Sequence, residues 1–173
     1  FDGNIRFRFR RTCFIGSDVT LSIAFPGSIR ILSGASLTNN GTLTLYSGQT
    51  ISANGATSIF RNNGTLNAGT TFLASFAGSF FSHNVGSAVV LRNVPGGDVP
   101  IPVSGYYDLG FEFLTASYTV NSDLVVLNDL ATATSATSID FNGNDLYVGG
   151  HWDQRNSNIS NLGTVFFDGT NQR

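Results

Sequence analysis

Short apolar runs alternate with polar clusters along the whole chain, and no stretch repeats with the 3.6-residue period of a helix. Gly, Asn, Asp, Ser or Pro bounds each run, which is the pattern of strands and turns. Glu112 is the only Glu in the chain. The chain is therefore predicted to be all-β. The expected strands are residues 5–9, 19–25, 28–32, 41–46, 87–91, 117–120, 123–127, 145–150 and 163–169.

The turns between these runs recur at a nearly constant spacing. The phrase "NNGTL" occurs at 39–43 and again at 62–66, 23 positions later, and "HNVGS" follows at 83–87. Gly110 is a weaker echo of the same spacing. The residues assigned to these turns are Asn39, Asn40, Gly41, Asn62, Asn63, Gly64, Asn84, Gly86 and Gly163.

A period of about 20–25 residues with strand and turn content is typical of a β-solenoid. The sequence predicts one parallel β-solenoid (β-helix) domain over 1–173, with about seven coils of about 22–27 residues. An antiparallel β-sandwich is the alternative, because Asn-Gly is also the strongest hairpin signal. Equal spacing favours the solenoid, since hairpins do not require it.

The physics of stacking explains the repeated phrase. Coils of a solenoid lie about 4.8 Å apart, so equivalent positions sit above one another. Stacked Asn side chains are expected to form amide ladders, and Gly is expected at a turn position with positive φ. Leu43 and Leu66 should face inward, with the preceding Thr outward.

Composition narrows the class of protein. Only 12% of residues are charged, all nine cations are Arg, and Lys and Met are absent. That charged share is about half the usual one and suits an extracellular β-protein. The net charge of −2 argues against nucleic acid as a partner. Cys13, alone, can form no internal disulfide, and no run approaches the ~20 apolar residues of a membrane span. A first residue other than Met suggests a processed chain or a segment.

Arginine and phenylalanine alternate at the start of the chain. Arg6, Arg8 and Arg10 are expected on one strand face, with Phe7 and Phe9 on the other. The arginines could grip an acidic polysaccharide, or pack against aromatic rings of a neighbouring protomer. The favoured interpretation is structural, because outward charges block unwanted edge pairing.

Residues 93–107 hold three of the four prolines and interrupt the rhythm of the coils. An inserted Pro/Gly-rich loop is predicted there, with Tyr106 and Tyr107 as candidate ligand contacts, because loops often carry binding surfaces. Trp152, the sole Trp, follows His151. A sugar-stacking role is one interpretation of this pair, and a rim residue covering the core is the favoured one.

Several acidic residues are candidates for catalysis. A glycosidase needs two carboxylates held across a sugar. Asp123 and Asp145, or Asp108 and Asp129, are about one coil apart and could meet on adjacent coils. Turn and strand-end carboxylates are the favoured interpretation. No "GxSxG" elbow occurs, so no enzyme activity is expected.

The phrase "DFNGND" (140–145) is a weak candidate for a calcium site. Asp140, Asn142 and Asn144 imitate the first half of a Ca²⁺ loop, but position twelve is His151 rather than a carboxylate. The EF-hand interpretation therefore fails. An oxygen-lined turn site between coils stays open, and no other cofactor or metal is expected.

The last third of the chain carries a resemblance. The phrases "FNGNDLYVGGHWDQRNSNIS" (141–160) and "GTVFFDGTNQ" (163–172) resemble the β-helical repeat regions of very large secreted surface proteins and adhesins of Bacteroidota, often exported by the type IX system. The match departs at "HWDQRNSN", where a plain Asn-Asn-Gly turn is expected. The resemblance implies a cell-surface adhesin or filament segment, used for attachment or gliding, without catalytic residues.

The function expected from all this is a non-catalytic structural and adhesive segment of an extracellular bacterial surface protein or filament. "FDGN" at 1–4 and "FDGT" at 167–170 suggest one unit of a tandem array. Self-association into a fibre or array is expected, end to end or side by side, with surface polysaccharide as another candidate partner. A polysaccharide-active β-helix enzyme is one alternative. A carbohydrate- or ice-binding module with a flat Thr/Ser/Asn face is the other.

Overall fold

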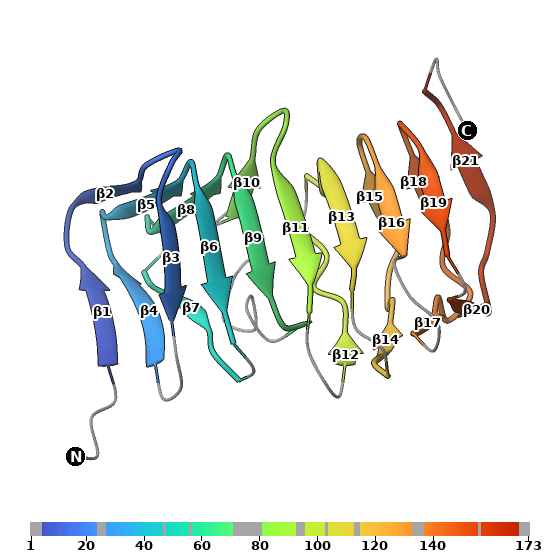
Figure 1. The fold of residues 1–173 in the computed structure, drawn as a ribbon, viewed down its shortest axis with the longest axis horizontal. Coiled ribbons are helices and arrows are strands. Elements are labelled where there is room, and N and C mark those ends of the chain that lie inside the picture. Colours follow the sequence, from blue (N-terminus) through green and yellow to red (C-terminus); the bar gives the residue numbers. More distant parts are fainter. Residues whose placement is uncertain are drawn as a thin grey trace.

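The computed structural model is a stack of parallel β-strand coils, which run along its long axis from the N-terminal to the C-terminal end (Figure 1). It describes residues 5–23, 27–46, 48–55, 57–70, 81–92, 96–102, 104–112, 115–132, 137–155 and 157–169. Every strand pair within these ranges is parallel, as in Thr42–Leu45 beside Thr65–Ala68. The predicted β-solenoid is confirmed, and the antiparallel sandwich is wrong.

The N-terminal coils contribute to two of the five sheets. Sheet A has the order β1 (Ile5–Phe9), β4 (Gly27–Leu32), β7 (Ile51–Asn54). Sheet B has the order β10 (Phe81–His83), β8 (Ile59–Asn62), β5 (Ser36–Asn39), β2 (Thr12–Ile15).

The C-terminal coils contribute to two further sheets. Sheet D has the order β12 (Gly96–Asp98), β14 (Ser117–Thr119), β17 (Ser138–Asp140), β20 (Asn158–Ser160). Sheet E has the order β15 (Leu124–Val126), β18 (Leu146–Val148), β21 (Val165–Phe167).

Sheet C runs through the whole molecule and joins both halves. Its order is β19 (Trp152–Gln154), β16 (Leu130–Thr132), β13 (Asp108–Phe111), β11 (Ala88–Leu91), β9 (Thr65–Ala68), β6 (Thr42–Leu45), β3 (Thr20–Ile23). The chain returns to this sheet once per coil, so its seven strands mark six complete turns.

The coils are shorter than predicted, especially in the C-terminal half. The register gives coil lengths from 24 residues (Thr12 to Ser36) down to 19 (Leu146 to Val165). The reason is local: β14 to β21 each have three residues, whereas β1 to β9 have four to six.

An inward row of side chains on sheet C forms the spine of the core. In register order it consists of Leu21, Leu43, Leu66, Val89, Leu109, Leu130 and Trp152. The five inner members are at most 2% exposed, whereas Leu21 and Trp152 are partly exposed. Full burial stabilises each such side chain by about 1.5–3 kcal/mol. The inward Leu and outward Thr of the "NNGTL" phrase are confirmed.

The glycines of "NNGTL" are required for a reason other than the one expected. Neither Gly41 nor Gly64 has a positive φ. A Cβ on Gly64 would lie 2.1 Å from the carbonyl oxygen of Gly41, and one on Gly41 would lie 2.2 Å from that of Gly16. Glycine is thus needed because adjacent coils approach closely at this corner. Gly110 is no echo of this position, because it lies opposite Val90.

The described part of segment 93–107 belongs to the coil. Gly96–Asp98 forms β12, which pairs with β14, and Tyr106 makes an isolated bridge to Val126. A Cβ on Gly96 would lie 2.0 Å from the carbonyl oxygen of Ser117, so glycine permits this close pairing. Residues 93–95 and 103 lie outside the described residues.

We predict that Gly64→Ala lowers the free energy of unfolding by about 2–3 kcal/mol, because the new methyl group overlaps a backbone oxygen of the next coil. Gly110→Ala is the control. Its Cβ would find ordinary contacts at 3.6 Å, so the change should be neutral or stabilising by about 0.5–1 kcal/mol. Chemical denaturation measures both. Equal costs for the two variants would contradict the close approach of coils at Gly64.

Candidate functional site

Two of the predicted turn asparagines are core residues. Asn39 and Asn62 end β5 and β8, and both are fully buried. The amide nitrogen of Asn39 donates to the side-chain oxygen of Asn62 at 2.8 Å and to the carbonyl oxygen of Thr65 at 3.0 Å. The interpretation of Asn39 and Asn62 as turn residues is corrected: they line the inside of a corner.

The predicted amide ladders are present. Asn62 donates to the carbonyl oxygens of Gly64 and Ala88, each at 3.0 Å. On the outer side of the same corner, Asn63 donates to the side-chain oxygen of Asn40 at 2.9 Å. The bonds from Asn39 to Asn62, from Asn62 to Ala88 and from Asn63 to Asn40 tie adjacent coils together.

The remaining predicted turn residues are not equivalent to "NNG". Asn84 is exposed, and its backbone N–H donates to the carbonyl oxygen of Asn62. Gly86 has a φ of +84° in open space, on a corner two residues longer than the one at Gly64, because His83 and Ala88 lie opposite Asn62 and Thr65. Gly163 makes room for Asp145, whose carboxylate would lie 2.5 Å from an added Cβ.

In the C-terminal half, aspartates take over the role of the asparagines. Asp108 accepts hydrogen bonds from the backbone N–H of Asp129 at 3.0 Å and from the side chain of Asn128 at 2.7 Å. One coil further on, Asp129 accepts from the backbone N–H of His151 at 2.8 Å. We call this series the Asp108 staircase.

A second series, the Asp123 staircase, lies on the neighbouring corner. Asp123 accepts from the backbone N–H of Asp145 at 3.0 Å, and Asp145 accepts from that of Thr164 at 2.7 Å. The expectation that Asp108 and Asp129, and likewise Asp123 and Asp145, lie one coil apart is thus confirmed. Each carboxylate is held against the backbone of the next coil, where it satisfies an N–H group. Sequence analysis missed this structural role, although the 21- and 22-residue spacings of the two aspartate pairs match the coil length.

The candidate calcium residues form a hydrogen-bonded turn. Asp140 accepts from the backbone N–H of Asn142 at 2.8 Å and from the side chain of Asn161 at 3.0 Å. Asn144 turns its amide nitrogen toward the carbonyl oxygens of Val120 and Phe141. Asn142 has a φ of +51°, as expected for Asn in a tight turn. Across the described ranges, no three His, Cys, Asp or Glu side chains gather closely enough to hold a metal ion.

The expectation that Tyr106 contacts a ligand is wrong. Its side chain is fully buried, its hydroxyl donates to the carbonyl oxygen of Pro100, and burial raises the pKa of Tyr106. Tyr106 is therefore a core residue. Tyr107 is half-buried at the next position. The candidate contacts from this segment do not form an exposed aromatic pair.

The arginine stripe lies on the outermost strand of sheet A. Phe7 and Phe9 sit in register with the fully buried Ile29 and Ile31, so they face inward as predicted. Arg8 and Arg10 are exposed, and Arg8 lies in register with Arg30. The side chain of Arg6 lies outside what the structure describes.

The N-terminal end of the stack is uncovered in the described structure. Strands β1, β2 and β3 each have a partner on one side only, namely β4, β5 and β6. Phe7 is 37% exposed, although Ile29, one coil further in, is fully buried. The outermost coil thus presents both unpaired strand edges and inward-facing apolar side chains.

The C-terminal end has the same character. Strands β19, β20 and β21 are the outermost members of their sheets. Phe167 is 50% exposed, although the Val148 in register beneath it is fully buried. Trp152 lies 6.2 Å from Phe167, ring centre to ring centre, and ends the inward row of sheet C. Trp152 therefore covers the core at the rim, which was the favoured interpretation.

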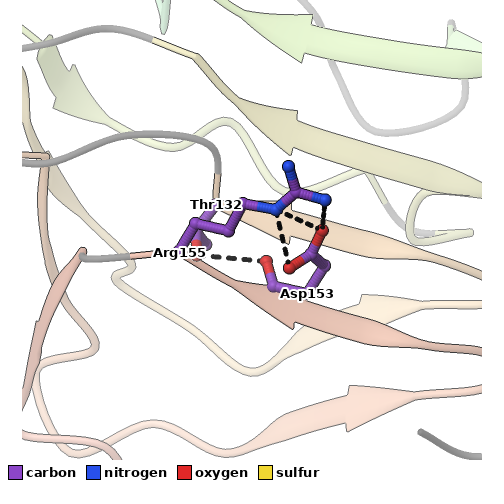
Figure 2. Close-up of polar contacts among 3 residues, drawn as sticks. All are labelled: Thr132, Asp153 and Arg155. Carbon is purple, nitrogen blue, oxygen red and sulfur yellow. Dashed lines mark hydrogen bonds and ion pairs between the residues drawn. The ribbon is translucent and has the colours of Figure 1, made fainter.

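One exposed ion pair lies on the last strand of sheet C. Figure 2 shows Arg155 beside Asp153, with its Nη2 2.7 Å from the carboxylate, and Thr132 next to both. The hydrogen bond and charge of Asp153 raise the pKa of Arg155. Both side chains are exposed, so the pair adds little stability.

Sheet C also carries a small grid of polar side chains on its outer face. Thr20, Thr42 and Thr65 lie in register on three adjacent coils. A second row contains Ser22, Thr44 and Asn67, and Asn67 donates to Thr44 at 3.3 Å. The next coil places Ala88 and Val90 at these positions, so the grid ends there.

Comparisons with protein-family models, curated proteins and solved structures find no match to this chain. The assignment of a β-solenoid therefore depends on the parallel strand pairing observed in this structure alone. Among the described residues, the structure contains no helix with the length and apolar character needed to span a membrane.

We predict that Asn62→Ala lowers the free energy of unfolding by about 2–4 kcal/mol. The substitution removes the acceptor of Asn39 and the donor to two backbone carbonyls, all in a buried corner. Asn63→Ala is the matched control, because the side-chain bond from Asn63 to Asn40 lies on the partly exposed side of the corner. It should cost about 1 kcal/mol by the same denaturation measurement. A smaller loss for Asn62→Ala than for Asn63→Ala would contradict the importance of the buried ladder.

Proposed function

We propose that this chain is a non-catalytic structural and adhesive segment of an extracellular bacterial surface protein or filament, which extends by stacking of its end coils. The observation that carries the proposal is the uncovered apolar row at each end. Phe7 at one end and Phe167 at the other occupy inward positions whose neighbours one coil further in are fully buried. A further coil on either end would bury them and pair the free strand edges.

The use of the aspartates supports a non-catalytic role. Asp108, Asp123, Asp129 and Asp145 each accept a backbone N–H from the adjacent coil. A glycosidase needs a pair of carboxylates that flank a sugar, one to protonate the leaving group and one to act as nucleophile or base. Carboxylates held along a corner of the stack serve the backbone instead.

Composition and resemblance support the cellular setting. A surface rich in Asn, Ser and Thr with only 12% charged residues suits a secreted β-protein. The phrases at 141–160 and 163–172 resemble repeat regions of large surface proteins of Bacteroidota exported by the type IX system. We infer from these two observations that the segment works outside the cell, within an adhesin or a surface filament. The "FDGN" copy that suggested a tandem array lies outside the described residues.

Electron microscopy of the purified chain at rising concentration tests this proposal. Particles should lengthen in steps of about 35 Å, which is the height of seven coils at about 4.8 Å each. Phe167→Lys should weaken this association by about tenfold or more, because an inward-pointing charge opposes edge pairing.

Val85→Lys is the control, because Val85 is 82% exposed on a corner in the middle of the stack. It should leave the length distribution unchanged. Particles that stay single, short and blunt at every concentration would overturn the stacking part of the proposal. Turnover of a polysaccharide by the unmodified protein would overturn the non-catalytic part.

A carbohydrate-binding module is a second candidate, and the polar grid on sheet C favours it. Rows of Thr20, Thr42, Thr65 and of Ser22, Thr44, Asn67 offer hydroxyls and amides at regular intervals on a β-sheet face. If the grid binds glycans, Thr42→Val with Thr65→Val should abolish retention on a polysaccharide affinity gel, and retention that survives this change would exclude the grid.

A further inference from the structure

The charges of the chain are segregated along its length. Residues 1–92 carry seven Arg and two Asp, a formal charge of +5. The rest of the chain carries two Arg and nine acidic residues, a formal charge of −7. The small net charge of −2 therefore hides two halves of strong and opposite sign.

The coil order converts this sequence asymmetry into a spatial one. The coils follow one another along the long axis, so the basic half lies at one end of the stack and the acidic half at the other (Figure 1). The first described coil, residues 5–23, has four Arg and one Asp. The last described stretch, 138–169 with residue 156 omitted, has four Asp and one Arg.

Charged side chains are exposed at both ends of the stack. Arg8, Arg10 and Arg11 are exposed on the first coil, and Asp153 and Asp168 are exposed near the last strands. Among the described residues, only one ion pair joins the two halves, between Arg92 and Glu112 at 2.7 Å. Asp153 pairs locally with Arg155, within the same half.

We propose that the basic N-terminal coil docks onto the acidic C-terminal coil of a second copy of this chain, so that stacking is head-to-tail and directed by charge. This inference rests on the end stacking proposed above and adds its polarity and its partner. Three features coincide at each end: unpaired parallel strand edges, exposed inward apolar side chains, and charge opposite to that of the other end.

Only the head-to-tail arrangement uses all three features. Two N-terminal ends facing each other would bring like charges together, and their strand edges would run antiparallel. Side-by-side antiparallel packing would match the charges but leave Phe7 and Phe167 uncovered. A head-to-tail contact joins two different surfaces and leaves a free copy of each, so it propagates into an open filament.

Charge reversal at single ends gives the sharpest test. Variant one carries Arg8→Glu and Arg10→Glu, which makes the N-terminal coil acidic. Variant two carries Asp153→Arg and Asp168→Arg, which makes the C-terminal coil basic by an equal change in charge. Each variant alone should associate about tenfold or more weakly than the unmodified chain, measured by sedimentation velocity at about 0.01 M NaCl, where the screening length is about 30 Å.

An equimolar mixture of the two variants should recover the association, because each reversed end meets a reversed partner. Raising NaCl to about 1 M, where the screening length falls to about 3 Å, should weaken the assembly of the unmodified chain. Arg61→Glu is the positional control. Arg61 is exposed two coils inward from β2, and its reversal should have a smaller effect than that of Arg8→Glu alone.

The outcomes separate this inference from the function on which it rests. Association that is insensitive to salt and to both variants would overturn the proposal that charge directs the stacking, but it would leave the end stacking itself intact. A chain that stays monomeric in every sample would overturn both. Failure of the mixture to recover would overturn the head-to-tail pairing, as would particles that widen without lengthening under the electron microscope. Binding of an acidic polysaccharide by a persistently monomeric chain would reassign the arginines to that ligand.

Discussion

The parallel stacking of backbone, one coil about 4.8 Å above the next, is the constraint on which the rest of this structure depends. It leaves so little room at the corners that Gly41 and Gly64 cannot carry a Cβ. It also places identical groups directly above one another, which suits Asn62, because its amide accepts from Asn39 on one neighbouring coil and donates to Ala88 on the other. The inward leucines of sheet C follow the same rule and form a continuous apolar row.

The same constraint explains why unpaired strand edges and exposed inward-facing side chains occur together at the ends of the stack. In sheet C, every inner strand has a partner on both sides and buries its member of the apolar row, whereas β3 and β19 at the two ends have a partner on one side only. The two ends differ in charge because the chain travels along the axis only once, so the arginine-rich first half and the aspartate-rich second half cannot mix. A stack of this kind has a built-in direction.

Much of the fold could be predicted from the sequence because "NNGTL" carries the true register: Asn39 lies opposite Asn62, and Thr42 opposite Thr65. The C-terminal coils could not be predicted in this way, because the equivalent corners there lack the "NNGTL" phrase. Asp108 and Asp129 replace the amide ladder in the second half, so a search for Asn-Gly loses the period there. Tyr106 was misplaced because prolines nearby suggested a loop, whereas the segment contains β12 and returns to the core. The segregation of charge can be read from the sequence, where the arginine cluster at 6–11 is its most evident part.

Spin-label distances along one row of sheet C test the stacked register most directly. Ser22, Thr44, Val90 and Asp153 share an outward row in register, with Ser22 and Asp153 six strand intervals apart. Pulsed electron resonance on pairs with Asp153→Cys should give about 29 Å from Ser22→Cys, about 24 Å from Thr44→Cys and about 14 Å from Val90→Cys, in the Cys13→Ser background. Distances that fail to fall by a constant step per coil would contradict the parallel stack.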